Sequence, residues 1–225
     1  MRLTVLGATG ATGRLVVRRA LDEGHHVTAV VRDPARLPVT GEALDVATVG
    51  DVTDPEPLAE LCRDRDAVLS CLGTTTRRAP AVLAPATHAL VRAAQAAGMT
   101  RALVISAAPV GPPAPDEGLP ARRIVFPLVR AVFRDVYADS AAMEEELARS
   151  PLDWTALRPG RLTNTPATGH YHHRIGTNVP TTGSLPRADL AHAMLDLLPQ
   201  EATWRQVVGV GPVRRRKGRH GELGA

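Results

Sequence analysis

Three glycines spaced three residues apart, Gly7, Gly10 and Gly13, are the first residues of this chain with a clear chemical use. They lie where an apolar segment, residues 3–6, runs directly into an amphipathic one. Gly7 can take backbone angles that are closed to residues with a Cβ atom, Gly10 lets the backbone approach a pyrophosphate, and Gly13 lets a helix pack closely on a sheet. A helix that begins here presents free N–H groups and the positive end of its dipole to an anion. The spacing therefore predicts a nucleotide-binding turn.

Two arginines follow the next apolar segment, residues 26–31. Arg32 stands where a fold that prefers NAD usually has a carboxylate for the ribose 2′-hydroxyl, and Arg36 comes one helical turn later. Two guanidinium groups on one side of the chain would bind a 2′-phosphate well. The charges therefore favour NADP(H) over NAD(H) as the cofactor. A solvated Arg32 that pairs with the adjacent Asp33 is the alternative interpretation.

Further candidate residues follow later apolar segments, at positions that a parallel sheet would bring to one edge. Asp51 and Val52 follow the third segment, and Cys71, Leu72 and Gly73 follow the fourth. In a dinucleotide-binding crevice these two groups would border the adenine and the nicotinamide ribose. Cys71 is also explained as a small core residue at the end of a strand.

Two residues are candidates for catalysis. Ser106 follows the fifth apolar segment, where its hydroxyl would bind a substrate carbonyl or the nicotinamide carboxamide, or would cap local backbone. Tyr137 is the obvious proton donor, but residue 141 is alanine and Lys217 is the only lysine in the chain. The Tyr-x-x-x-Lys arrangement that acidifies a tyrosine is therefore absent, and packing is the favoured role of Tyr137.

A pair of histidines and the serines of the chain indicate neither a metal site nor a hydrolase. His170 and His172 would point to one face of a strand, but no carboxylate or cysteine accompanies them at ligand spacing. We therefore expect a segment that lines a substrate site, and no metal. The chain also lacks the Gly-x-Ser-x-Gly sequence of a nucleophile elbow, which argues against a hydrolase.

The elements that must position these residues alternate between strand and helix. This order predicts a single α/β domain over residues 1–211, with a doubly wound parallel sheet of Rossmann type and helices on both faces. The expected strands are residues 2–6, 26–31, 44–49, 67–71, 102–105, 153–157 and 206–210. The expected helices are residues 11–23, 55–62, 81–97, 135–149 and 187–198.

The region after Ser106 is expected to cover the crevice. It contains five prolines between residues 109 and 120, which exclude a regular helix or a central strand there. Its place after the carboxyl end of a parallel strand favours a lid over the ligand. Residues 122–133 are largely apolar, and Pro127 is expected to bend or split them. We expect residues 106–136 and 158–185 together to form the substrate crevice.

Composition places this domain among ordinary cytoplasmic proteins. Hydrophobic residues make up 44% of the chain, and no apolar run is long enough to span a membrane. The net charge of +4 comes entirely from residues 212–225, a basic segment that we expect to be a disordered tail. Because the rest of the chain is neutral, nucleic acid is not the expected partner, and the oligomeric state stays open.

Seven short motifs occur in an order that is typical of one known family. They are Gly7-Ala8-Thr9-Gly10-Ala11-Thr12-Gly13, Val31-Arg32-Asp33, Arg36-Leu37-Pro38, Gly50-Asp51-Val52, Leu72-Gly73-Thr74, Ser106-Ala107 and Arg158-Pro159-Gly160. Over residues 1–210 the chain resembles the atypical short-chain dehydrogenase/reductases of the NAD(P)H-binding, NmrA-like group. Within that group it is most similar to NADPH-dependent flavin reductases of the biliverdin reductase B type.

The resemblance implies a role for each matching residue. The turn from Gly7 to Gly13, with Thr9, Gly10, Ala11 and Thr12, would hold the pyrophosphate. Arg32 and Arg36 would hold the 2′-phosphate, and Asp51 and Val52 would flank the adenine. The nicotinamide would be surrounded by Leu72, Gly73, Ser106, Pro159 and Gly160. The chain departs from the family pattern in two places, because Gly160 stands where biliverdin reductase B has a histidine and residues 122–133 look like added material.

The leading functional hypothesis is an NADPH-dependent oxidoreductase that transfers hydride to a flavin, a quinone or a similar electron-poor small molecule. Such acceptors take their proton from solvent, so that the missing tyrosine and lysine pair would not be disabling. One alternative is a redox-sensing regulator that binds NADP(H) without turnover. Another is a biosynthetic carbonyl reductase or epimerase with a specific substrate.

Overall fold

The computed structural model describes residues 1–73 and 81–213, and within these residues eight strands form one sheet. Residues 214–225 of the predicted tail, and Thr74 of the fifth motif, lie outside the described residues, whereas Pro212, the first residue of the predicted tail, is the last residue of β10 (Gln206–Pro212). The strand order is β3-β2-β1-β4-β5-β6-β10-β8. The strands of the sheet are β1 (Arg2–Leu6), β2 (His26–Val31), β3 (Leu44–Thr48), β4 (Ala67–Ser70), β5 (Arg101–Ile105), β6 (Asp153–Pro159), β8 (Tyr171–Ile175) and β10 (Gln206–Pro212).

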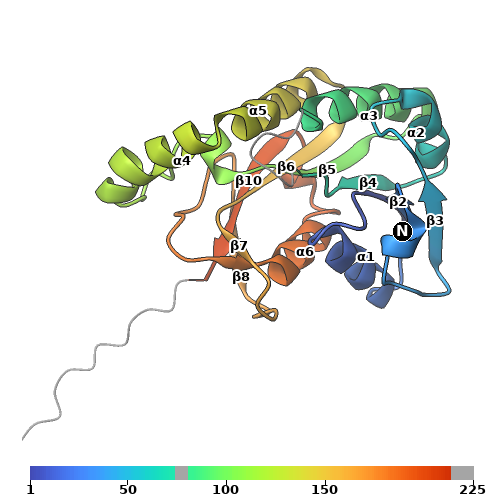
Figure 1. Cartoon of the computed structure of the whole chain (residues 1–225), viewed down its shortest axis with the longest axis horizontal. Coiled ribbons are helices and arrows are strands. Elements are labelled where there is room, and N and C mark those ends of the chain that lie inside the picture. Colours follow the sequence, from blue (N-terminus) through green and yellow to red (C-terminus); the bar gives the residue numbers. More distant parts are fainter. Residues whose placement is uncertain (74–80, 214–225) are drawn as a thin grey trace, which may run out of the picture.

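Helices cover both faces of this sheet. The helices are α1 (Gly13–Asp22), α2 (Pro55–Cys62), α3 (Leu83–Ala97), α4 (Phe126–Val132), α5 (Arg134–Arg149) and α6 (Arg187–Asp196). Figure 1 shows α2, α3 and α5 on one face and α1 with α6 on the other. Two separate hydrophobic clusters fill these layers. Neighbouring strand residues supply different clusters, as Leu69 and Val68 do, because side chains alternate across a strand. The predicted doubly wound fold is therefore confirmed.

The main departure from the expected strands is at the far edge of the sheet. Strand β8 pairs antiparallel with β10, whereas every other pairing in the sheet is parallel. Its sequence, Tyr-His-His-Arg-Ile, is too polar to indicate a strand by itself. A second, two-stranded sheet joins β7 (Leu162–Thr163) to β9 (Leu185–Pro186).

Most helix boundaries differ from the expected ones by one or two residues. Helix α1 begins at Gly13 instead of residue 11, because the chain first turns tightly and the Gly10 N–H bonds to the Gly7 carbonyl at 2.9 Å. Residues 122–133 are not split at Pro127: a π-helical turn η3 (Ala121–Val125) runs directly into α4 with helical backbone angles at Val125 and Phe126, and the helix ends with its C-cap at Phe133. In Figure 1 this segment extends beyond the sheet. Among the described residues, no helix has the length and apolar character that crossing a membrane requires.

Candidate nucleotide and substrate site

The carboxyl ends of β1 and β4 lie side by side where the strand order changes direction. From β1 the chain continues outward to β2 and β3, and from β4 it continues to the other side of the sheet. Open α/β sheets bind ligands at this switch point. The glycine turn follows β1, and Cys71, Leu72 and Gly73 follow β4, so the structure brings these two predicted groups together.

The glycine turn has the geometry of a phosphate site. Gly7 has a φ of +70°, and a Cβ atom there would lie 2.8 Å from the carbonyl carbon and oxygen of Cys71. A Cβ atom on Gly13 would lie 2.1 Å from the Gly7 carbonyl oxygen. Both positions therefore require glycine.

The beginning of helix α1 also has unused hydrogen-bond donors. Within the described residues, no acceptor lies within hydrogen-bond distance of the N–H groups of Ala11, Thr12 and Gly13. The Thr12 side chain makes no capping hydrogen bond to the helix. Free donors at a helix N-terminus beside tightly packed glycines fit a pyrophosphate.

Arg32 and Arg36 lie at the end of β2 on the same edge of the sheet. Both side chains are exposed, and within the described part of the chain neither has a carboxylate within 4 Å. The Asp33 carboxylate instead accepts the Ala35 N–H at 3.0 Å and caps the short helix η1 (Pro34–Arg36). The alternative interpretation, a pair between Arg32 and Asp33, is therefore not the arrangement that forms.

The residues expected near the adenine and those expected near the nicotinamide ribose differ in how far their side chains are exposed to solvent. The Asp51 carboxylate is exposed and accepts the Thr53 N–H and hydroxyl at 2.8 and 2.7 Å, which lowers its pKa. Val52 is half-buried beside it. The Cys71 side chain packs in the core with its Sγ atom 3.9 Å from Met194 Sδ, and burial raises its pKa to about 12. A thiol with a raised pKa is not an activated nucleophile at neutral pH.

Ser106 belongs to a buried polar network that the sequence did not reveal. Its hydroxyl donates to Glu144 Oε1 at 2.5 Å, and its N–H donates to the Leu157 carbonyl. Glu144 also forms a two-point ion pair with Arg158, whose Nε lies 2.9 Å from Oε1. Because its proton is committed to Glu144, the Ser106 oxygen can accept a hydrogen bond but does not supply a proton. Glu144 is one of three consecutive glutamates, and only the helix geometry shows which of them points inward.

A cavity of about 550 Å³ opens at the ends of β5 and β6, where Ala107 lines it and the preceding Ser106 is buried. One wall consists of Ala107, Pro109, Pro159 and Gly160. The opposite wall comes from η3, α4 and α5 and consists of Val125, Phe126, Val129, Phe133 and Tyr137. Its volume and mainly apolar lining are typical of small-molecule sites.

Tyr137 forms part of this wall, and residue 141 on the same helix is alanine, so the tyrosine has no lysine at the spacing of a Tyr-x-x-x-Lys pair. Its ring centre lies 6.0 Å from that of Phe133, and burial raises its pKa. A raised pKa makes the phenol a weaker acid, so the structure gives no sign of an activated proton donor.

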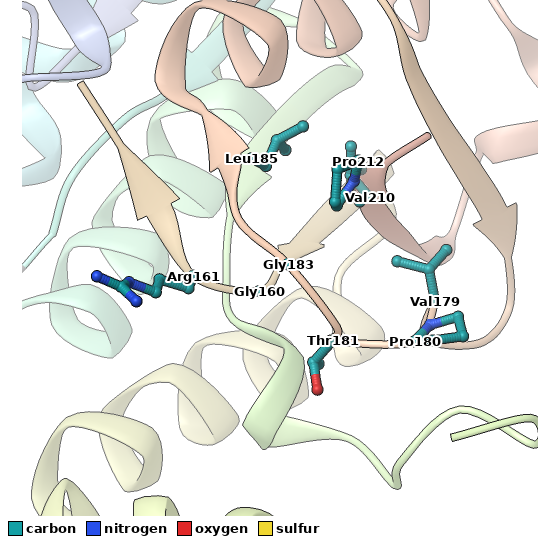
Figure 2. Close-up of a pocket in the computed structure, with 10 residues that line it drawn as sticks. Gly160, Arg161, Val179, Pro180, Thr181, Gly183, Leu185, Val210 and Pro212 are labelled. Atoms are coloured by element: carbon teal, nitrogen blue, oxygen red, sulfur yellow. The ribbon is translucent and has the colours of Figure 1, made fainter. Parts of the chain in front are cut away.

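A much smaller cavity, of about 10 Å³, adjoins the large one (Figure 2). The two share Gly160, Arg161, Thr181 and Gly183. The small cavity has room for about one water molecule and extends toward the buried side of β10. A Cβ atom on Gly160 would meet only ordinary contacts, 3.7–3.9 Å from Thr181, so packing does not force glycine at this departure from the family pattern.

The proline-rich segment is tied to the rim of the cavity by side chains from elsewhere. Asn178 Nδ2 donates to the carbonyls of Ala108 and Pro112 at 2.8 and 2.7 Å. Arg130 donates to the carbonyls of Pro109 and Gly111. These bonds would have to break before the segment could open as a lid.

His172 and His173 of the histidine segment lie in β8, at the edge of the sheet. His172 Nδ1 lies 3.1 Å from the Pro212 carbonyl oxygen. In the described ranges, no three metal-ligating side chains come together.

Comparisons with known proteins agree with this geometry. A family model described as NAD(P)H-binding matches residues 7–201. The chain is 35% identical over 187 residues to the 3-diazoavenalumate denitrifying reductase of a Streptomyces species, a match that covers 76% of this chain and 59% of that protein. The chain thus spans less than two thirds of this curated relative.

Solved structures share the fold over nearly the whole chain. The oxidoreductase ylbE of Lactococcus lactis has a TM-score of 0.79 at 21% identity, covering 95% of this chain and 92% of that one. ChuY, described as an anaerobillin reductase from Escherichia coli O157:H7, has a TM-score of 0.75 at 24% identity, covering 96% of this chain and 99% of that one. At these identities the likeness shows a common fold.

Proposed function

Because the chain belongs to the NAD(P)H-binding family, we propose that it is an NADPH-dependent oxidoreductase whose hydride acceptor binds in the large cavity. The observation that carries this proposal is the position of the cavity. It begins at Ala107, Pro159 and Gly160, at the carboxyl ends of β5 and β6, on the sheet edge that carries the glycine turn. A bound nicotinamide at this edge would face the cavity.

The cofactor side of the proposal rests on the glycine turn and on two arginines. The free N–H groups at the start of α1 would bind the pyrophosphate, and Arg32 with Arg36 would bind the 2′-phosphate. Ser106, Pro159 and Gly160 would position the nicotinamide. With its proton held by Glu144, Ser106 would accept a hydrogen bond from the carboxamide N–H.

NADPH supplies the hydride when it is bound. The protein would hold the nicotinamide and the acceptor in position and exclude water from the site. The apolar walls would exclude water and hold a flat acceptor in line for transfer. A flavin or quinone then takes its proton from solvent, so that no side-chain acid is needed. The relatives described as a diazo-compound reductase and an anaerobillin reductase support a reductase with an electron-poor acceptor.

A regulator that binds NADP(H) without turnover is the second candidate, and one observation favours it. Large apolar side chains are exposed together on the segment around η3 and α4, including Leu119 at 66%, Ile124 at 64% and Leu128 at 61%. An exposed apolar group of this kind is typical of a surface that binds another protein.

A tryptophan placed in the cavity tests whether the acceptor of the proposed enzyme binds there. Val129→Trp on α4 fills the cavity from the wall away from the cofactor residues, so acceptor turnover should fall at least tenfold while NADPH binding is unchanged. Leu128→Trp is the matched control, because Leu128 is exposed on the same helix and does not line the cavity. Equal turnover by both variants would mean that the acceptor does not bind there.

A further inference from the structure

Arg161 is the one charged side chain among the described residues that line the large cavity. The other lining residues are apolar, aromatic or small, apart from the hydroxyls of Tyr137 and Thr181. Arg161 lies directly between the end of β6 and the start of β7, and its carbonyl accepts the Leu185 N–H at 2.8 Å. The backbone that carries this cation is therefore fixed at the cavity wall.

The guanidinium group of Arg161 has no partner within the described parts of the chain. Other arginines of this region are engaged: Arg158 by Glu144, Arg174 by Asp116, and Arg130 by backbone carbonyls. In Figure 2 the Arg161 side chain extends away from Val179 and Pro180. An exposed cation beside apolar walls is able to meet an anion of a bound molecule.

The carboxylate buried near this wall, that of Glu117, uses one of its oxygens to hold Thr181, while its Oε1 is buried without a hydrogen-bond partner among the described residues. Glu117 Oε2 accepts the Thr181 N–H at 2.7 Å and the Thr181 hydroxyl at 3.0 Å. Glu117 is buried, does not line the cavity, and makes no ion pair with Arg161 within 4 Å. The positive charge at the wall is therefore not neutralised by this carboxylate.

We infer that Arg161 selects acceptors that carry an anionic group, such as a carboxylate, sulfonate or phosphate, on a flat and otherwise apolar body. This inference rests on the proposed function, because it names the acceptor class of the same cavity. The apolar walls would hold the ring system, and the guanidinium group would form a charge-assisted hydrogen bond to the anion at the mouth.

Matched acceptor pairs test the inference. 1,4-Naphthoquinone and 1,4-naphthoquinone-2-sulfonate share a quinone ring system and differ by one anionic group, as do riboflavin and FMN. In each pair the anionic member should have the higher kcat/KM, and Arg161→Ala should lower its kcat/KM about tenfold while the neutral member changes little. Arg161→Lys should keep part of the preference, since it keeps the charge and loses the planar fork.

A second arginine serves as the control. Arg123 is exposed on η3 and does not line the cavity, so Arg123→Ala should leave both acceptors unaffected. If Arg161→Ala keeps the full preference, or if Arg123→Ala removes as much of it, the inference is wrong.

Binding separates this inference from the proposed reaction. FMN and riboflavin are titrated by flavin fluorescence into protein saturated with NADP⁺, with no turnover required. A preference for FMN that depends on Arg161, together with no NADPH oxidation, would support the anion site and defeat only the hydride-transfer proposal. No preference for the anionic member in either binding or turnover overturns the inference even if NADPH is oxidised.

Discussion

At the scale of residues, the buried network of Ser106, Glu144 and Arg158 ties three elements together beside the cavity. Glu144 and Arg158 expose only 10% and 11% of their side chains, so removing either one would leave the other as a buried charge without its partner. The Arg158 guanidinium also occupies the space next to Gly111, where a Cβ atom would lie 2.0 Å from it. The network therefore fixes the ends of β5 and β6 and the following loop, which is what a site for precise hydride transfer needs.

The first prediction at this scale concerns cofactor choice. Arg32→Glu combined with Arg36→Ala should weaken NADPH binding by about tenfold or more and leave NADH binding nearly unchanged, because only NADPH has the 2′-phosphate. Fluorescence titration of both cofactors measures the two effects. Equal losses for NADPH and NADH would show that these arginines do not bind the 2′-phosphate.

The sequence predicted some of these residues better than others. The glycine turn was predictable because its spacing and its place between two apolar segments have a direct backbone cause. Glu144 was not, because three glutamates in a row are alike until the helix orients them. Arg161 was not predicted as a site residue either, because its role depends on a cavity whose walls come from segments far apart in the sequence.

At the scale of elements, helix α3 depends on a carboxylate from another helix. Asp139 of α5 accepts the N–H groups of Val82, Leu83 and Ala84 at 2.9–3.0 Å and so caps α3 from outside. The carboxylate also lies at the positive end of the α3 dipole. This contact holds the two helices together.

Removing this cap should destabilise the fold measurably. Asp139→Ala leaves three donors without their acceptor, and we expect a loss of about 1–3 kcal/mol in the free energy of unfolding. Chemical denaturation measures it. The control is Asp135→Ala in the same helix, whose side chain is 72% exposed and which should cost far less. Similar losses in the two variants would contradict the capping role.

The elements themselves were predicted to within a few residues wherever apolar periodicity was strong. Strand β8 was missed because its polar residues give no strand signal, and it is held by antiparallel pairing with β10, about thirty residues later in the chain. The type of helix in η3 was also unpredictable, since a π-helical turn depends on local packing more than on residue pattern.

At the scale of the whole molecule, the fold separates two tasks. The half of the sheet built from β1 to β4 carries the nucleotide turn and the candidate phosphate-binding arginines, and the half built from β5 onward carries the cavity. The doubly wound parallel sheet that joins the halves follows from the alternation of strands and helices, which is why the sequence predicted this kind of sheet. The sequence predicted which segments would form the crevice, residues 106–136 and 158–185, but not the shape of the cavity, which depends on how η3 and α4 pack against the loops after β5 and β6.

The most direct test of this account is NADPH oxidation, followed by the loss of its near-ultraviolet absorbance, with a panel of flavins, quinones and simple carbonyl compounds. NADPH binding is first confirmed by fluorescence. The account predicts turnover with at least one flavin or quinone, faster with NADPH than with NADH. Tight NADPH binding with no oxidation in the presence of any acceptor would contradict it and favour the regulator.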